Sequence, residues 1–304
     1  MGKQVQTPSS NSGAISGTAA RILTAAVLIP AVAAAVWWGS TALVAALGGM
    51  VAVLALLEFF SLGARLNLQA YRLWTSICAL GIFFQQWSVR GAQSYQVGRN
   101  LRLTQLPAMP ELPLELVFFI FLLGCAATVF ASRRPLANAI GDIGISSAGL
   151  IFIALPVSAV VRLHAVPLIG PKLLLFTLLL VWVGDTLAYF VGRSLGRMPM
   201  APQLSPKKTW EGAAANLLGS AIVALVLFNW LDIDVFQAVF MACLANAAGQ
   251  AGDLLKSAYK RGAGVKDSGT LLPGHGGILD RIDALILAAP VVWYYFRFLV
   301  ASRF

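Results

Sequence analysis

The chain has 304 residues, of which 59% are hydrophobic and only 11% are charged, and its formal net charge is +10. Its mean hydropathy of +0.79 lies far above that of a soluble globular domain. The apolar runs are long enough to cross roughly 30 Å of hydrocarbon at about 1.5 Å per residue. The composition therefore excludes a soluble domain and predicts an all-α, polytopic integral membrane protein.

Residues 1–20 are rich in Ser, Gly, Thr and Gln and contain no apolar run, which predicts a disordered cytoplasmic tail. Residues 21–304 are expected to form a single transmembrane domain. Hydropathy predicts about nine transmembrane helices in it. Their expected ranges are 22–38, 41–61, 72–88, 114–132, 141–161, 171–191, 212–231, 235–256 and 281–301.

The distribution of basic residues predicts the orientation of these helices. With nine spans, the tail and the loops after the second, fourth, sixth and eighth helices lie on one side and carry fifteen of the 22 Lys and Arg residues. Loops rich in Lys and Arg remain in the cytoplasm. Arg65 and Arg134 are interpreted as part of this topogenic bias, whereas the carboxylates on the same side need another explanation.

The loop from Asp253 to Asp283 is the strongest candidate for a functional site. Six of the sixteen residues from Gly262 to Gly277 are glycine, so backbone N–H groups there can surround an anion. Basic side chains suit phosphate, and aspartates supply the hard oxygen ligands that Mg²⁺ prefers. The basic residues are Lys256, Lys260, Arg261, Lys266 and Arg281, and the acidic ones are Asp253, Asp267, Asp280 and Asp283. This combination predicts a metal–nucleotide site.

Two further features place acidic groups near this loop. Asp185 lies inside the sixth predicted helix, about 12 Å before Arg193. An ionisable residue at that depth indicates function, and an intramembrane pair with an arginine is the alternative. Asp280 and Asp283 are three residues apart and so share one helical face. Asp280 could instead only cap its helix.

The loop after the sixth helix carries a second cluster of polar residues. Ser205-Pro206-Lys207-Lys208-Thr209 offers hydroxyl and ammonium groups just before a predicted helix, where free backbone N–H groups also favour phosphate. The chain contains no P-loop and no Gly-x-Gly-x-x-Gly motif after a strand.

Together the two loops resemble the membrane-integral phosphatidate cytidylyltransferases, also called CDP-diacylglycerol synthases. The resemblance is densest over residues 184–283, and Glu58-Phe59 adds to it. Its long motif is Ser257-x-x-Lys260-Arg261-x₄-Lys266-Asp267-x-Gly269-x₃-Pro273-x-His275-Gly276-Gly277-x-x-Asp280-Arg281-x-Asp283. Two positions depart from it: Lys256 stands where many bacterial members have glutamate, and Ala284 stands where serine is common.

The resemblance implies the reaction of CTP with phosphatidate to give CDP-diacylglycerol and pyrophosphate. The residues implied fall into three groups. The catalytic group is Lys260, Arg261, Lys266, Asp267, His275 and Arg281, although His275 could instead only stabilise its loop. The substrate-binding group is Ser205, Lys207, Lys208, Thr209, Gly276 and Gly277. The metal ligands are Asp253 and Asp280, with Asp185 and Asp283 as further ligands or as partners of ligands.

The expected cofactor is Mg²⁺, with a second cation left open. The expected partners are CTP, phosphatidic acid, the lipid bilayer and a second copy of the chain, without nucleic acid. The expected location is a bacterial-type inner membrane, with the active site facing the cytoplasm. Two alternatives remain: a CTP-dependent transferase acting on another lipid such as a polyprenyl acceptor, and a secondary transporter. A transporter requires ionisable groups along a path through the bilayer.

Overall fold

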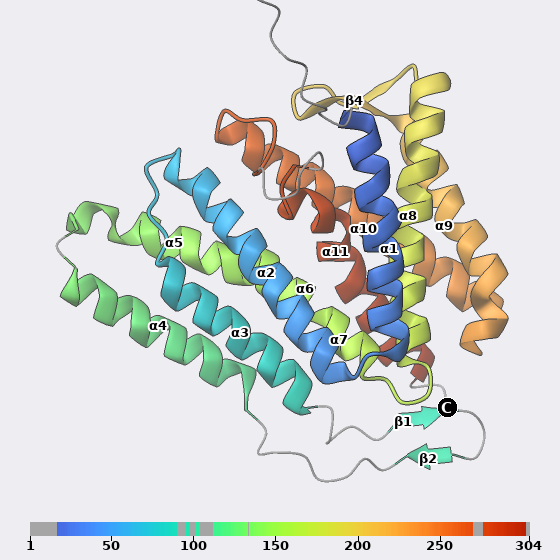
Figure 1. The fold of residues 1–304 in the computed structure, drawn as a ribbon, viewed down its shortest axis with the longest axis horizontal. Coiled ribbons are helices and arrows are strands. Elements are labelled where there is room, and N and C mark those ends of the chain that lie inside the picture. The colour runs from blue at the N-terminus through green and yellow to red at the C-terminus, as the bar shows by residue number, and fades with distance from the viewer. Residues whose placement is uncertain are drawn as a thin grey trace, which may run out of the picture.

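The computed structural model describes residues 17–89, 95–97, 101–103, 112–132, 134–269 and 276–301. These residues form an assembly of helices with two short antiparallel hairpins, so the prediction of an all-α polytopic membrane protein is confirmed (Figure 1). Each of the nine predicted spans coincides with helix. The helices that correspond to single spans are α1 (Gly17–Trp38), α2 (Thr41–Ala64), α3 (Arg72–Ser88), α4 (Leu114–Ala131), α8 (Gly170–Ser194), α9 (Trp210–Leu231), α10 (Val235–Gly262) and α11 (Leu279–Tyr295), which the π-helical turn η4 (Phe296–Val300) extends.

The count of nine is approximate as a number of membrane crossings. Seven helical segments in the described part of the chain are long and apolar enough to cross a membrane, judged by length and composition. The two predicted spans outside these seven are shorter: the apolar stretch of α1 is only Ala26–Trp38, and α3 has 17 residues. Helix α1 begins four residues inside the predicted tail, and residues 1–16 lie outside the described residues.

The fifth span is a composite of short helical pieces around Pro156. Because proline has no N–H, it cannot donate to the carbonyl four residues earlier, and a helix widens or kinks at such a point. Here the N–H of Leu155 donates to Leu150, five residues back. The pieces are η2 (Leu136–Asn138), α5 (Ala139–Gly149), the π-helical turn η3 (Leu150–Ala154), α6 (Leu155–Val157) and α7 (Ala159–His164).

Polar segments lie at the two ends of the helical assembly. The start of α1 and the strand β4 (Ser205–Thr209) lie at one end, whereas β1 (Tyr95–Val97) lies at the other (Figure 1). Strand β4 pairs with β3 (Pro199–Ala201), and β1 pairs with β2 (Leu101–Leu103). This separation is consistent with helices that cross a bilayer between two aqueous faces.

Glycines allow α8 and α9 to pack closely. A Cβ added to Gly184 would lie 2.0 Å from Oδ1 of Asn216, and one added to Gly219 would lie 3.2 Å from Cα of Gly184. Close backbone approach of this kind drives helix association in membranes, because lipid tails are as apolar as leucine and supply no hydrophobic driving force. The contact holds α9, and the β4 strand before it, in a fixed position beside α8.

Arg134 has a structural role that its interpretation as a topogenic residue missed. Its Nη1 lies 3.3 Å from Oδ2 of Asp142 and 2.8 Å from the carbonyl oxygen of Gln69. Asp142 is 1% exposed and also accepts the backbone N–H of Gln69 at 2.7 Å. The guanidinium lies 5.5 Å from the ring centroid of Tyr71. Arg134 therefore fixes the α2–α3 connection to α5.

We expect Arg134→Ala to lower the midpoint of thermal unfolding of the detergent-solubilised protein by several degrees. Removing one partner leaves the buried Asp142 carboxylate without its ion pair, a change that costs up to about 3–5 kcal/mol when both charges are buried and less here because Arg134 is partly exposed. Arg65→Ala is the matched control, because Arg65 is exposed and has no ion pair among the described residues. Equal shifts in the two variants would contradict this role.

Candidate active site

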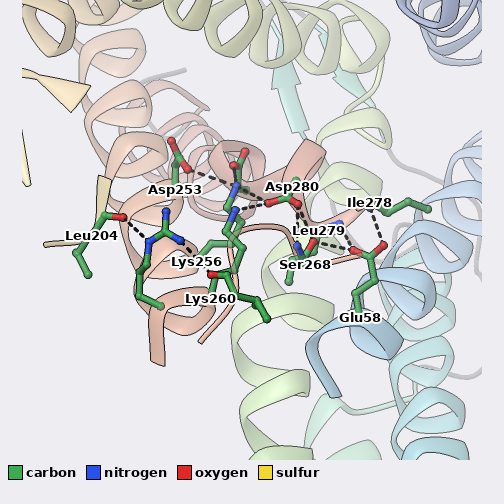
Figure 2. A network of polar contacts seen from close by, with 12 residues as sticks. Glu58, Leu204, Asp253, Lys256, Lys260, Ser268, Ile278, Leu279 and Asp280 are labelled. Atoms are coloured by element: carbon green, nitrogen blue, oxygen red, sulfur yellow. Dashed lines mark hydrogen bonds and ion pairs between the residues drawn. The ribbon is translucent and has the colours of Figure 1, made fainter. Parts of the chain in front are cut away.

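Three aspartates from two neighbouring helices surround the amino group of Lys256. Its Nζ lies 3.4 Å from Oδ1 of Asp253 on α10 and 3.2 Å from Oδ1 of Asp280 on α11, and it also contacts Oδ2 of Asp283 on α11. The Lys256 side chain is only 8% exposed. Figure 2 shows this ammonium between the carboxylates of the two helices. This cluster of charged side chains therefore lies where α10 and α11 meet.

Helical periodicity and close packing at glycine bring these groups together. Asp253, Lys256 and Lys260 are three and four residues apart and so lie on one face of α10, as Asp280 and Asp283 do on α11. Glycines let the helices approach: a Cβ added to Gly252 would lie 2.7 Å from the carbonyl oxygen of Asp283. The prediction that Asp280 and Asp283 share a face is confirmed by their common partner, Lys256.

Asp280 connects this cluster to the glycine-rich loop. Its Oδ1 accepts a hydrogen bond from Nζ of Lys260 at 2.7 Å. Its Oδ2 accepts the backbone N–H of Ser268 at 3.1 Å and lies 2.9 Å from the hydroxyl oxygen of the same residue. Asp280 is thus more than a helix cap, because it holds a lysine from α10 and the loop at once.

Strand β4 brings the second predicted motif to the same place. The amino group of Lys208 donates to Oδ2 of Asp253, so the Ser-Pro-Lys-Lys segment lies against α10. Arg261 supports this contact, since it donates to the carbonyl oxygens of Leu204 at 3.2 Å and of Val265 at 3.1 Å (Figure 2). Thr209 caps α9 by accepting the N–H of Gly212 at 3.1 Å. The two loops that the sequence linked only by resemblance are therefore in direct contact.

Glu58 is a residue of this site to which the sequence gave no role. It lies on α2, more than two hundred residues away in sequence, and is 5% exposed. Its carboxylate accepts the backbone N–H groups of Ile278 at 3.0 Å and Leu279 at 2.9 Å, and Oγ of Ser268 lies 3.0 Å away. Figure 2 shows these contacts converging on Glu58. The sequence signals it in two ways, as a glutamate near the end of an apolar span and as part of the Glu58-Phe59 pair that adds to the resemblance.

The glycines beside Glu58 leave no room for side chains. A Cβ added to Gly277 would lie 2.3 Å from Oε2 of Glu58 and 2.2 Å from Oγ of Ser268, and one added to Gly269 would lie 2.5 Å from Oε1 of Glu58. Gly276 has a φ of +76°, in the left-handed region that glycine adopts without strain. Gly277 thus permits close packing, and Gly276 permits the turn into α11.

Asp185 belongs to a separate row of polar side chains. The side-chain amide of Asn216 donates a hydrogen bond to the Asp185 carboxylate at 3.0 Å. The amide of Asn246 donates to the side-chain oxygen of Asn216 at 2.6 Å, and the amide of Gln250 donates to that of Asn246 at 2.8 Å. This row crosses from α8 through α9 to α10. Within the described residues Asp185 has no arginine partner, so the alternative of an intramembrane ion pair is not what the structure shows.

The structure places the remaining predicted residues in different surroundings. Lys207, Lys266 and Asp267 are exposed and make no ion pair among the described residues. Ser205 is half-buried in β4, and Arg281 is exposed on the first turn of α11. His275 lies outside the described residues.

The donor set fits a divalent metal ion in its chemistry, since carboxylate oxygens are the ligands that Mg²⁺ prefers. Asp253 is the most accessible of the three aspartates, with a side chain 29% exposed against 11% for Asp280 and 15% for Asp283. No group of three or more Asp, Glu, His or Cys side chains in the described part of the chain is arranged to hold a metal ion. The ammonium of Lys256 fills the space between the aspartates. The residues therefore fit one cation beside Asp253, not several between the carboxylates.

The fold and site define a multi-pass membrane protein with a cluster of lysines and aspartates at one end. Residues 19–299 match the model of the cytidylyltransferase family. The phosphatidate cytidylyltransferase of Haemophilus influenzae is 32% identical over 295 residues, which cover 92% of this chain and 99% of that protein. The chain belongs to the cytidylyltransferase family.

Other relatives match over shorter stretches. The phosphatidate cytidylyltransferase of Bacillus subtilis is 32% identical over 183 residues, 60% of this chain and 67% of that protein. The enzyme of that name from Staphylococcus saprophyticus is 42% identical over 125 residues, 40% of this chain and 48% of that protein.

We expect Glu58→Gln to lower both kcat/KM and the midpoint of thermal unfolding. An amide cannot accept on both of its polar atoms, so at least one of the N–H groups of Ile278 and Leu279 or the Ser268 hydroxyl loses its acceptor. A hydrogen bond to a charged group contributes about 1.5–3 kcal/mol. Glu115→Gln is the control, because Glu115 is exposed on the first turn of α4. An unchanged unfolding midpoint for Glu58→Gln would contradict the role assigned to Glu58.

Proposed function

We infer that this protein is a phosphatidate cytidylyltransferase, which transfers the cytidylyl group of CTP to phosphatidate. Its family and the match with the Haemophilus enzyme over nearly the whole of both chains support this activity. The observation in the structure that carries it is the convergence of Lys208, Lys256 and Lys260 on three aspartates where β4, α10 and α11 meet. In the reaction a phosphatidate oxygen bonds to the α-phosphorus of CTP, and the bond from that phosphorus to the bridging oxygen breaks and releases pyrophosphate.

Both substrates are anions, so catalysis consists mainly of positioning them and neutralising their charge. Lys207 and Lys266 are exposed and make no ion pair among the described residues, which leaves their ammonium groups available for phosphate oxygens. Lys208 can exchange its contact with Asp253 for a nucleotide phosphate. The nucleophile is already an anion near neutral pH, so the reaction requires no strong general base.

A small apolar pocket of about 20 Å³ lies beside Lys256 and is the apolar surface next to the cluster that an acyl chain could contact. Its lining includes Phe59 of α2, Phe152 of η3, Tyr259 of α10 and Leu287 of α11. A diacyl substrate cannot leave the bilayer readily, since each buried CH₂ group contributes about 0.8 kcal/mol. Apolar surface that ends at an ammonium group suits a molecule with acyl chains and a phosphate head.

We propose Mg²⁺ as the cofactor, held beside Asp253, while Asp280 and Asp283 keep Lys256 in place next to that carboxylate. When bound, it would supply positive charge to the nucleotide phosphates and to the departing pyrophosphate. The residues of the chain position this charge: Lys256 keeps the three aspartates together, and Glu58 and Ser268 hold the loop that leads into α11.

The proposed location is the bacterial inner membrane, with the site facing the cytoplasm, where CTP is present. The bacterial relatives and the Lys and Arg distribution support it. We also propose a homodimer, on the resemblance to the family alone.

The test of the activity is incorporation of labelled CTP into lipid by the purified protein. We expect a liponucleotide product with phosphatidate and little with a polyprenyl phosphate, because the relative that matches nearly the whole chain is a phosphatidate cytidylyltransferase. If product forms only with the polyprenyl phosphate, the substrate is that lipid and not phosphatidate. If neither lipid gives a liponucleotide, the protein does not transfer a cytidylyl group.

We expect Asp253→Asn and Asp280→Asn each to reduce turnover by at least about 100-fold, the scale of a lost electrostatic element of catalysis. The measurement is kcat at saturating Mg²⁺ and CTP. Asp232→Asn is the control: Asp232 ends α9 in the left-handed conformation, which Asn also adopts, and lies on the connection to α10 away from the cluster. Activity near that of the parent in both site variants would contradict the assignment.

Cysteine labelling tests the orientation, on a background in which Cys78, Cys125 and Cys243 are replaced by alanine. With nine spans, Lys266→Cys should react with an impermeant thiol reagent only from the cytoplasmic side. Asp232→Cys should react only from the opposite side. Labelling of both positions from the same side would contradict the proposed topology.

A further inference from the structure

Lys256 is distinctive because it supplies one buried positive charge to three carboxylates. An ammonium group has three N–H donors and no acceptor. Its three carboxylate partners are Asp253, Asp280 and Asp283, so each donor has an acceptor. At 8% exposure, water contributes little to the solvation of this group. The ammonium is therefore solvated by carboxylates, as a bound metal ion would be.

The charge of Lys256 is also what allows these aspartates to lie so close together. Like charges at contact distance in a partly buried site repel strongly unless a cation compensates them. Two other lysines compensate from the sides: among the described residues, Lys208 pairs with Asp253 and Lys260 pairs with Asp280. For Asp283 the described residues provide no other cation than Lys256.

A metal ion cannot occupy the same position while the ammonium is there. Mg²⁺ binds oxygen at about 2.0–2.1 Å and Ca²⁺ at about 2.3–2.6 Å, so either ion between these carboxylates would lie in contact with Nζ. The accessible carboxylate, Asp253, has its Oδ2 directed toward Lys208 rather than Lys256. A cation can approach that oxygen by displacing the more exposed lysine.

We propose that the ammonium of Lys256 is a built-in cation of the active site, so that the site binds a single divalent ion and has no place for a second one between Asp253, Asp280 and Asp283. Lys256 is in this sense a positioning residue, which acts through the three aspartates. A role of Lys256 in catalysis rests on the proposed function. The test of the proposal, however, measures metal binding and stability, which do not depend on which lipid is the acceptor.

The test counts Mn²⁺ ions bound by the full-length protein in detergent, from the free Mn²⁺ signal in electron paramagnetic resonance after the protein is stripped with chelator. We expect the parent protein to bind at most about one Mn²⁺ per chain. Lys256→Met, which keeps the length of the side chain without its charge, should bind about one more. Lys256→Arg, which restores the charge, should bind no additional ion.

A matched control removes a lysine elsewhere in the helices. Lys172 donates to the carbonyl oxygen of Trp230 at 3.1 Å and makes no ion pair among the described residues, so Lys172→Met should leave the number of bound ions unchanged. Thermal unfolding provides a second readout. Mn²⁺ should raise the unfolding midpoint of Lys256→Met by several degrees more than that of the parent protein.

Two Mn²⁺ ions per chain in the parent protein would overturn the proposal, and this result requires no variant to fold. The same number of ions in the parent and in Lys256→Met, with equal stabilisation by Mn²⁺, would also overturn it. Failure of the proposed function has a different signature, since it would appear as an absence of liponucleotide product while the ion counts stay as expected.

Discussion

The arrangement of the active site depends on the compensation of buried negative charge by lysines. Three aspartates in helices that cross or border a membrane would be strongly unfavourable alone, because the hydrocarbon cannot solvate them. Here each aspartate contacts at least one ammonium group, and Lys256 contacts all three. Such pairs do little for stability compared with an apolar core, but a single partner cannot be removed without leaving an unpaired charge. The charges therefore fix the position of α11 against α10, and Lys208 links β4 to α10.

The backbone is shaped to make these contacts possible. Gly252 lets α10 approach the carbonyl of Asp283, and Gly277 lets the chain pass beside Glu58. Glu58 accepts two N–H groups at the start of α11, where a helix has unpaired donors and a positive end of its dipole. Through this residue α2, far away in sequence, determines where the glycine-rich loop ends. The lysines of the cluster and the small apolar pocket beside Lys256 are thereby held beside one another.

Much of this fold was predictable, because apolar length determines a membrane helix whatever its neighbours are. The spacing of three residues, close to one helical turn, also correctly placed Asp280 and Asp283 on one face of α11. Contacts between distant segments were not predictable in the same way. Nothing local to Glu58 shows that its partners are the N–H groups of Ile278 and Leu279, and nothing local to Arg134 shows that Asp142 is buried beside it. For Lys256, basic character alone indicated phosphate binding, whereas the packing of two helices gives it three aspartates. The assignments of His275 and of the metal ligands stay predictions.

The central claim is that Lys256 and the aspartates act as one charged unit, and a double-mutant comparison tests it most directly. The measurement is the thermal unfolding midpoint of Lys256→Met, Asp283→Asn and the double variant in the same detergent, without divalent ions. Each single variant should lose much stability, since it leaves part of a buried ion pair unpaired, whereas the double variant should lose far less than the sum of the two losses. Losses that simply add would contradict the account, because they would show that Lys256 and Asp283 contribute independently.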